Sequence, residues 1–192
     1  MYTLRFNSNK EWRGDPKKSR NGNFLGFIEL LLFLSKNLDK TNYKMIEIGS
    51  YMGESTMLFA STCLFSKIYS IDPHFGKEEF NDMFDYNWNL VQSEYKTNLR
   101  FFDNIIHYKD YSFNVHNEFE DGSIDFIYID GNHSYESIKN DLELYLPKLK
   151  PNGIISGHDY NKRAWPETVK AIHEVIGYPN KIFSDTSWIK IL

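Results

Sequence analysis

Short apolar runs alternate with longer helical ones from residue 43 onward, and this alternation is the strongest constraint on the fold. The short runs are rich in β-branched and aromatic residues and predict strands at 43–48, 67–71, 105–108, 124–129, 154–155, 181–183 and 188–192. Apolar side chains at helical spacing predict helices at 24–38, 55–64, 80–99, a short segment ending near 119, 138–149 and 166–176. Strands that are apolar on both faces and separated by helices indicate a mostly parallel sheet covered by helices.

The last two expected strands are joined only by residues 184–187, so they can form a hairpin that adds an antiparallel edge. The sequence therefore predicts an α/β fold: a Rossmann-like three-layer sandwich with a mostly parallel seven-stranded sheet. No Pro/Gly/Ser linker divides the chain, and its 192 residues suit one core, so we expect one domain over 24–192. Residues 1–23 are polar and broken by glycine and proline, and are expected to form an arm.

Charge and composition exclude several classes of partner. The net charge is −4 and the basic residues are scattered, which gives no support for a nucleic-acid partner. The longest apolar run, 24–34, contains Glu29 and is too short to span a bilayer, so no membrane association is expected. Residues 1–10 lack the apolar core of a signal peptide, and Cys63 is the only cysteine, so a cytoplasmic location is expected.

Two further expectations concern packing. Cys63 lies in an apolar helical stretch, which predicts a buried structural thiol rather than a nucleophile. The helix expected at 24–38 is apolar enough to pack either on its own domain or on a second copy of the chain, which leaves a homo-oligomer open.

A glycine turn follows the first expected strand, in Glu47-Ile48-Gly49-Ser50-Tyr51-Met52-Gly53-Glu54-Ser55-Thr56. Two glycines allow a tight strand-to-helix turn and let a ligand approach the backbone closely. Their spacing is G-x-x-x-G, which differs from the G-x-G-x-x-G of dinucleotide sites and from a phosphate loop. Glu47 would repel a pyrophosphate but suits an ammonium or hydroxyl group, so the turn predicts a phosphate-free ligand such as S-adenosylmethionine.

An acid also ends the second expected strand, in Ile71-Asp72-Pro73-His74. A carboxylate at this position can accept hydrogen bonds from both ribose hydroxyls of an adenosine. Asp110, just after the third strand, could border the adenine, although a helix-capping acid fits it equally well. The candidate cofactor residues are Glu47, Gly49, Ser50, Tyr51, Gly53, Ser55, Asp72, Asp110 and Asp130.

Polar residues follow the fourth and fifth expected strands, in Asp130-Gly131-Asn132-His133 and His158-Asp159-Tyr160. Neighbouring parallel strands end at the same edge of a sheet, so we expect these side chains to surround one cleft. Asp130, His158 and Asp159 could supply three ligands to a divalent ion, and the imidazole favours Mn²⁺ over Mg²⁺. His133 is available as a general base, because the reference pKa of histidine is close to neutral.

Structural interpretations stand beside the functional ones. His133 and Ser134 begin an expected helix, so either could cap it, and His158 could be a hydrogen-bonded core histidine. The convergence of four such residues on two strand ends favours a functional site.

These motifs resemble those of the class I S-adenosylmethionine-dependent methyltransferases. The shared features are the Glu-x-Gly-x-x-x-Gly turn and the acid that ends the second strand. The resemblance implies that the glycine turn holds the methionine part of the cofactor and that Asp72 holds the ribose. The block 127–160, with its motifs Asp-Gly-Asn-His-Ser-Tyr, Leu-Lys-Pro-Asn-Gly and Gly-His-Asp-Tyr, is similar to the methyltransferase 24 type. This type groups small-molecule and sugar O-methyltransferases that are related to macrocin O-methyltransferase and more distantly to catechol O-methyltransferase.

By position, this resemblance implies Asp130, His158 and Asp159 as ligands of Mg²⁺ or Mn²⁺ and His133 as the base that takes the proton of a hydroxyl. His158 departs from the family, which has a carboxylate there. The expected activity is methyl transfer from S-adenosyl-L-methionine to a small molecule or sugar. A nicotinamide-dependent oxidoreductase is disfavoured by the missing G-x-G-x-x-G, and a binding module without chemistry is disfavoured by the intact His133 and Asp159.

Three segments could shape an acceptor pocket: the N-terminal arm, residues 74–99 and residues 160–165. Their aromatic and basic side chains could stack on or clamp a sugar or aromatic ring, although core packing explains most aromatics at helical spacing. These side chains are Trp12, Arg13, Tyr86, Trp88, Arg163 and Trp165.

Overall fold

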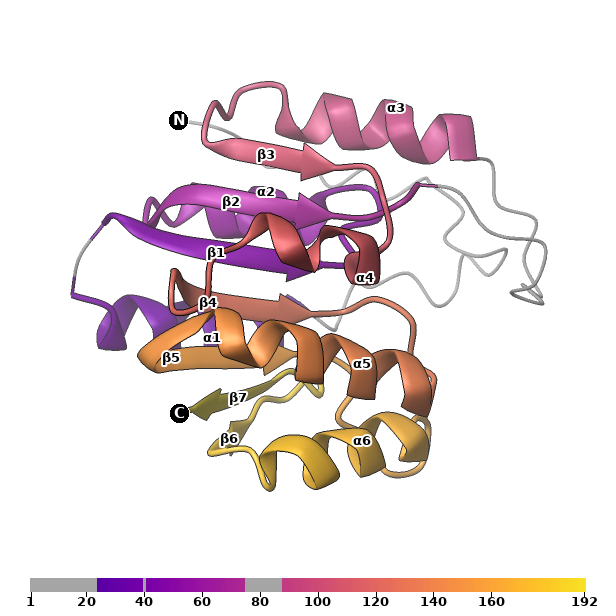
Figure 1. The fold of residues 1–192 in the computed structure, drawn as a ribbon. Coiled ribbons are helices and arrows are strands. Elements are labelled where there is room, and N and C mark those ends of the chain that lie inside the picture. The colour runs from indigo at the N-terminus through magenta and orange to yellow at the C-terminus, as the bar shows by residue number, and fades with distance from the viewer. Residues whose placement is uncertain (1–23, 40, 75–87) are drawn as a thin grey trace.

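A seven-stranded sheet forms the centre of the protein, in the order β3-β2-β1-β4-β5-β7-β6 (Figure 1). The structure is a computed structural model and describes residues 24–39, 41–74 and 88–192. The strands are β1 (Tyr43–Ile48), β2 (Phe65–Ile71), β3 (Ile105–Tyr108), β4 (Ile124–Ile129), β5 (Leu149–Gly157), β6 (Lys181–Ile182) and β7 (Trp188–Ile191). β1 to β5 pair in parallel, and β7 pairs antiparallel with both β5 and β6. The predicted antiparallel edge is confirmed.

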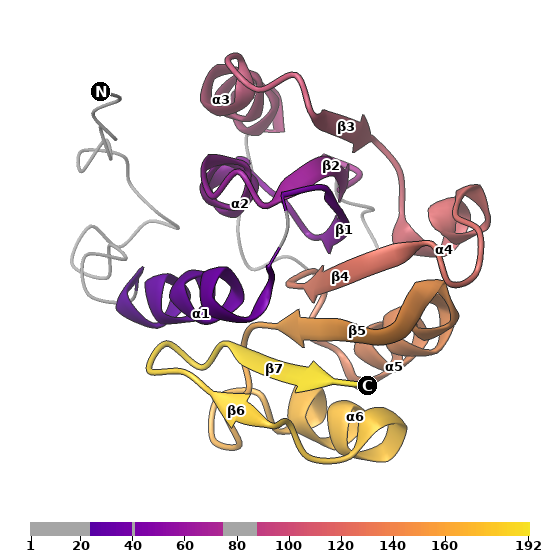
Figure 2. The same ribbon diagram turned by 90° about the vertical axis from the view of Figure 1, so that its left-hand side faces the viewer.

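Helices cover both faces of the sheet (Figure 2). One face carries α1 (Phe24–Asn37), α2 (Glu54–Ser61) and α3 (Trp88–Leu99), and the other carries α4 (Ser112–Val115), α5 (Tyr135–Tyr145) and α6 (Pro166–Ile176). Short 3₁₀ segments follow α4 at His116–Glu118 and α5 at Leu146–Lys148. The predicted three-layer, Rossmann-like α/β architecture is confirmed.

The two central strands contribute alternate side chains to two separate cores. Met45 and Phe126 pack with α1 and α2, whereas Ile46 and Ile127 pack with α5 and α6. All four side chains are completely buried. Because side chains alternate between the faces of a strand, a strand covered on both sides is apolar at most positions, and this is why β1 and β4 could be recognised in the sequence.

One face of α1 packs on the sheet of its own chain. Phe27, Leu30 and Leu34 are buried there, while Leu25, Ile28 and Leu32 are exposed on the opposite side. The first of the two expected packing arrangements is therefore present, and contact with a second copy stays a prediction. Within the described residues, none of the helices is long and apolar enough to cross a membrane.

Three expectations about local structure are wrong. The helix expected at 138–149 ends at Tyr145, because Pro147 has no N–H to continue it. The strand expected at 154–155 begins already at Leu149, and its register against β4 is irregular near Asn152, which has φ +62°. Cys63 is exposed rather than buried, because α2 ends at Ser61 and Cys63 lies at φ +58° in the turn that leads into β2.

Two other expectations can be followed only in part. The arm expected at 1–23, with Trp12 and Arg13, lies outside the described residues. The helix expected at 80–99 is described only as α3, and Tyr86 also lies outside the described residues.

Candidate active site

The carboxyl ends of β1, β2 and β4 meet at one edge of the sheet, where the glycine turn begins (Figure 1). Gly49 has φ +86°, and a Cβ atom there would lie 2.2 Å from the backbone oxygen of Asp130. Gly53 has φ +75° and precedes the first turn of α2. Gly49 thus allows the end of β1 to lie directly against the end of β4, which places the glycine turn beside the expected reacting residues.

Asp72 joins this turn to the end of β2. Its Oδ2 accepts a 2.7 Å hydrogen bond from Tyr51 N, and its Oδ1 accepts a 2.8 Å bond from His74 N. Each carboxylate oxygen can accept more than one hydrogen bond, so both keep the capacity to bind hydroxyl groups. Ser50, in the same turn, is buried, and its Oγ has no hydrogen-bond partner among the residues that the structure describes. An orphaned hydroxyl beside an anchored carboxylate is a feature that a polar ligand would complete.

Glu47 lies beneath the turn and is completely buried. Its carboxylate accepts hydrogen bonds from the hydroxyls of Ser55, at 2.5 Å, and Thr56. Burial raises its pKa to about 7, although the two hydroxyls act in the opposite direction. These contacts hold the first turn of α2 on β1, and a contact between Glu47 or Ser55 and a ligand stays a prediction.

The four residues expected to react come together at the ends of β4 and β5. His133 Nε2 lies 2.5 Å from Asp159 Oδ2 and 3.6 Å from Asp130 Oδ1. His158 Nδ1 lies 3.2 Å from Asp159 Oδ1 and 3.9 Å from Asp130 Oδ1. Two imidazoles therefore face one pair of carboxylates, as the sequence predicted.

These charges change the pKa of each member of the cluster. Burial alone would lower the pKa of His133, but the carboxylates of Asp130 and Asp159 outweigh it and raise the pKa to about 9. His158 behaves in the same way, with burial opposed mainly by Asp159 and Asp130, and its pKa is also raised to about 9. Burial would raise the pKa of Asp159, but the two histidines hold it well below its usual range. Both imidazoles are therefore charged at neutral pH when only protein groups surround them.

His133 is held by contacts of its ring, its backbone carbonyl and its Nε2 atom. Its ring stacks on Trp165, with the centroids 4.5 Å apart and the planes at 27°, and its carbonyl accepts a hydrogen bond from Thr168 Oγ1. Nε2 is buried, and its polar neighbours are Asp159 Oδ2 at 2.5 Å and Asp130 Oδ1 at 3.6 Å. The cap of α5 is Ser134, whose hydroxyl accepts from Ser137 N. Capping therefore does not explain His133.

The cluster fits a divalent cation by its donor set. One ligand atom each from Asp130, His133 and Asp159 lie within 4.8 Å of one another. Two carboxylates and an imidazole suit Mn²⁺ or a similar ion. His158 faces the same two acids from its own side, so either histidine could be the third ligand.

Asp185 belongs to this region but was not recognised in the sequence. Its side chain is 4% exposed, and its Oδ2 lies 3.8 Å from His158 Nε2. It sits in the turn between β6 and β7, and no motif marks that turn. Trp188, at the start of β7, donates from Nε1 to the carbonyl of His158 at 3.3 Å. The antiparallel edge therefore supports the ring that replaces the family's carboxylate.

Three other expected site residues lie on α3, α4 and the segment before α6. Asp110 accepts hydrogen bonds from Tyr111 N and Asn114 Nδ2 at the start of α4, which favours its structural interpretation. Trp88 begins α3. Arg163 is exposed, and its backbone N–H donates to Asn161 Oδ1 in the segment that leads to Trp165. Trp165, one of the expected pocket aromatics, contacts the cluster by stacking on His133.

Comparison with protein families gives one matching model, described as a methyltransferase domain, over residues 46–160. Protein R132 of Acanthamoeba polyphaga mimivirus, described as uncharacterized, is 28% identical over 151 residues, which cover 74% of this chain and 63% of that protein. Protein y4gI of Sinorhizobium fredii, also described as uncharacterized, is 26% identical over 62% of this chain and 13% of its own length. The chain thus spans less than two thirds of either relative.

Several solved structures share the fold. The O-methyltransferase NovP matches with a TM-score of 0.64 and 14% identity, over 85% of this chain and 79% of that one. A putative caffeoyl-CoA O-methyltransferase from Staphylococcus aureus matches with a TM-score of 0.61 and 19% identity, over 87% and 82%. The TDP-rhamnose 3'-O-methyltransferase CalS11 matches with a TM-score of 0.60 and 14% identity, over 87% and 79%. At identities this low, the similarity shows a common fold and nothing more specific.

Proposed function

The chain belongs to the class I S-adenosylmethionine-dependent methyltransferases, in the family whose model covers residues 46–160, and on this premise we propose that it methylates a hydroxyl of a small molecule or sugar. The observation that carries the proposal is the cluster of Asp130, His133, His158 and Asp159 directly beside the glycine turn. A methyl donor held by the turn would therefore lie next to groups that can bind and deprotonate an acceptor. The names of NovP and CalS11 describe O-methyltransferases, which supports oxygen as the acceptor atom.

The glycine turn would hold the methionine part of the cofactor, and Asp72 would hold the ribose. Ser50 supports this assignment, because its buried Oγ has no hydrogen-bond partner among the described residues. The glycines at 49 and 53 on either side of it have no side chains, which lets a ligand approach the backbone of the turn. Asp72 supports it as well, because two backbone N–H groups fix its carboxylate while leaving room for further hydrogen bonds.

His133 is the proposed general base. At neutral pH the ring carries a proton beside Asp130 and Asp159, so it must lose that proton, which requires a lower pKa, before it can take one from an acceptor hydroxyl. A divalent cation held by Asp130, Asp159 and His158 would supply positive charge that offsets these acids and acidifies an acceptor hydroxyl. Trp165 keeps the ring of His133 in place while this proton moves, because it covers one face of the imidazole.

Binding and turnover together test the proposal. We expect S-adenosylhomocysteine to bind the purified protein with a micromolar dissociation constant and to raise its melting temperature, whereas NADH does neither. Incubation with S-adenosylmethionine, Mn²⁺ and a panel of nucleotide sugars and catechols should yield S-adenosylhomocysteine with one acceptor class. Failure to bind S-adenosylhomocysteine contradicts the proposal. Binding without turnover on any acceptor favours the alternative of a binding module.

Chelation tests the cation separately. Exhaustive EDTA treatment is expected to abolish turnover while leaving S-adenosylhomocysteine binding within about threefold, and added Mn²⁺ should restore activity. Unchanged turnover after chelation would mean that Asp130 and Asp159 do not act by holding a metal ion. An Asp130→Asn variant that loses Mn²⁺ binding, measured by calorimetry, would support Asp130 as a ligand, and a His158→Ala variant compared with His133→Ala would show which imidazole is the third ligand.

A further inference from the structure

His74 connects the two loops that form the proposed nucleoside site. We propose that His74 is a positioning residue for cofactor binding, whose imidazole locks the glycine turn onto Asp72. The inference rests on the proposed function, because it assumes that this turn and Asp72 hold S-adenosylmethionine. In the sequence His74 stands only as a near neighbour of Asp72, and nothing in the motif assigns it a role.

Three hydrogen bonds close a ring between the loops. Tyr51 N donates to Asp72 Oδ2 at 2.7 Å, and His74 N donates to Asp72 Oδ1 at 2.8 Å. The side chain of His74 completes the ring, because its Nε2 lies 2.7 Å from the carbonyl oxygen of Tyr51. Asp72 alone would hold only the N–H of Tyr51, and His74 holds its carbonyl.

Both residues at the corners of this ring have strained backbones. Tyr51 has φ +45° and His74 has φ +51°, in the left-handed region that is unfavourable for a residue with a side chain. Such conformations persist only where surrounding contacts fix them. The hydrogen bond between the two residues is therefore expected to maintain the shape of the turn, including the orientation of the Ser50 hydroxyl.

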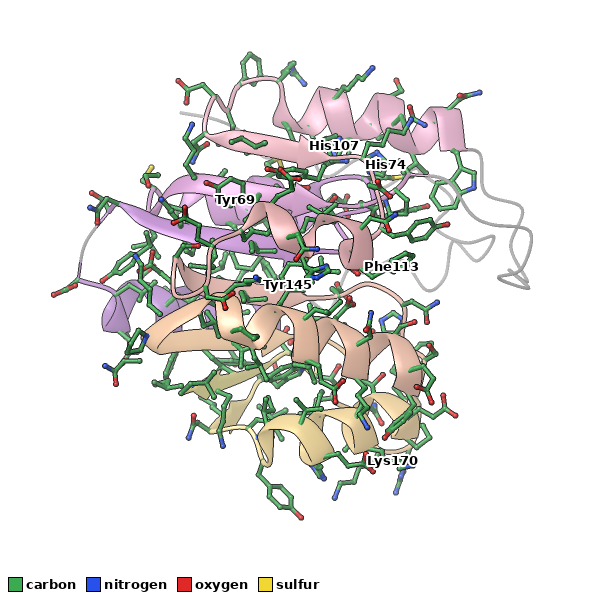
Figure 3. All side chains as sticks on the ribbon, in the orientation of Figure 1. Tyr69, His74, His107, Phe113, Tyr145 and Lys170 are labelled. Carbon is green, nitrogen blue, oxygen red and sulfur yellow. The ribbon has the colours of Figure 1, made fainter. Side chains whose placement is uncertain are left out.

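Packing gives the imidazole a single orientation. His74 is 1% exposed, and its ring lies 4.8 Å from that of Tyr95 and 4.6 Å from that of His107. Figure 3 shows His74 and His107 side by side close to α3, at the carboxyl ends of β2 and β3. Gln92 Nε2 donates to the carbonyl of His74, and so fixes its backbone as well.

The chemistry of the acceptor also fixes the tautomer. A carbonyl oxygen can only accept a hydrogen bond, so Nε2 of His74 must carry the proton. Burial lowers the pKa of His74 and favours the neutral ring, which has only one N–H to donate. His74 is thus a neutral donor, in contrast to the charged His133 and His158 of the acid cluster.

Replacement of His74 by Phe keeps a buried aromatic ring and removes the donor. We expect His74→Phe to weaken S-adenosylhomocysteine binding about tenfold by calorimetry and to raise the KM for S-adenosylmethionine by the same factor, with kcat within twofold. The matched control is Tyr95→Phe, which removes a 2.9 Å hydrogen bond to Ser70 but keeps the ring that packs beside His74 and Gly53. Its affinity and KM should stay within twofold of the wild type.

The His74→Gln variant restores an N–H donor, and the logarithm of its dissociation constant should return at least half of the way from the His74→Phe value to the wild-type value. A purely structural His74 would lower the melting temperature in both His74 variants and leave KM unchanged, and that result overturns the proposal. If no His74 variant folds, the wild-type histidine tautomers can be read by ¹⁵N NMR: a protonated Nε2 with slow exchange supports the proposal, and a protonated Nδ1 overturns it. A wild type that does not bind S-adenosylhomocysteine overturns the proposed function itself.

Discussion

The two ends of the proposed site are built from different interactions. At the ends of β1 and β2, Asp72 is held by two backbone N–H groups and Glu47 by two hydroxyls, so each acid is anchored by neutral donors. At the ends of β4 and β5, Asp130 and Asp159 face two imidazoles at distances between 2.5 and 3.9 Å. The first end is organised by hydrogen bonds, and the second by concentrated opposite charges.

This difference indicates how each end responds to a ligand. The hydrogen-bonded end is held mainly through backbone groups. Gly49 packs against the backbone of Asp130, and the strained Tyr51 is bound at its N–H by Asp72 and at its carbonyl by His74. The charged end is held by attraction between imidazoles and carboxylates, so its charges can rearrange around an ion or a hydroxyl. We therefore expect substitutions at the first end to act on cofactor affinity or folding, and substitutions at the second to act on turnover.

The largest effect is expected for His133→Ala. Loss of a general base typically lowers kcat by a factor of 10² to 10⁴, so we expect a fall of about a thousandfold. Affinity for S-adenosylhomocysteine should stay within threefold, because His133 belongs to the charged end only. The control is His116→Ala, a partly exposed histidine after α4 that should keep full activity. Normal turnover in His133→Ala would remove this residue from the mechanism.

The next effect concerns Gly49, which has no room for a side chain. A Cβ atom there would lie 2.2 Å from Asp130 O, and φ is +86°, so Gly49→Ala should lower the free energy of unfolding by about 3 kcal/mol. Gly122 is the matched control, because it also has a left-handed φ of +66°, but a Cβ atom there would meet nothing within 4 Å. Gly122→Ala should cost about 1 kcal/mol in the same urea titration. Equal losses in both variants would show that the close approach of β1 and β4 is not needed.

The comparison also explains how much of the site could be predicted from the sequence. Asp72, Asp130, His133 and His158 each follow a buried strand, and parallel strands end at one edge, so their approximate placement follows from the alternation of elements. Asp185 reaches His158 only because β7 runs antiparallel to β5, and this pairing has no local motif. The stacking of Trp165 on His133 depends in the same way on how the segment before α6 folds back.

Errors in the sequence prediction arose where a single backbone conformation decided the outcome. Cys63 was expected inside a helix, but a left-handed turn ends α2 before it and exposes the thiol. His74 was overlooked for a similar reason, since its importance depends on φ +51° and on a contact with Tyr51 that sequence spacing does not predict. Hydrophobic periodicity locates elements, but it carries little information about positive φ angles outside glycine.

The charged end should also make stability depend on pH. In EDTA, His133 and His158 have pKa values raised to about 9 from 6.5, so their stabilisation is fully present below pH 6.5 and is lost as pH rises through 9. We expect the free energy of unfolding to fall by about 1–2 kcal/mol between pH 7.5 and 9.5. This window lies above the ionisation of the buried acids Glu47 and Asp141, whose pKa is raised to about 7.

Urea titrations of the wild type and of Asp159→Asn measure this dependence. The variant lacks the carboxylate that lies 2.5 Å from His133 and 3.2 Å from His158, so its stability should change less over the same window. An equal slope in both proteins would mean that Asp159 is not needed to keep the two histidines charged in the folded state. Mn²⁺ affinity should rise over the same window, because protons compete for the same ligands.

The smallest effect is expected for Glu47→Gln, which tests the hydrogen-bonded end. Glu47 is completely buried and both of its oxygens already accept hydrogen bonds from Ser55 and Thr56, so an amide can keep part of this arrangement. We expect affinity for S-adenosylhomocysteine to change less than twofold and stability by under about 1 kcal/mol. A tenfold loss of affinity without loss of stability would instead assign Glu47 to the ammonium group of the ligand. That result would mean that the buried carboxylate reaches the cofactor, and that both ends of the site use charge.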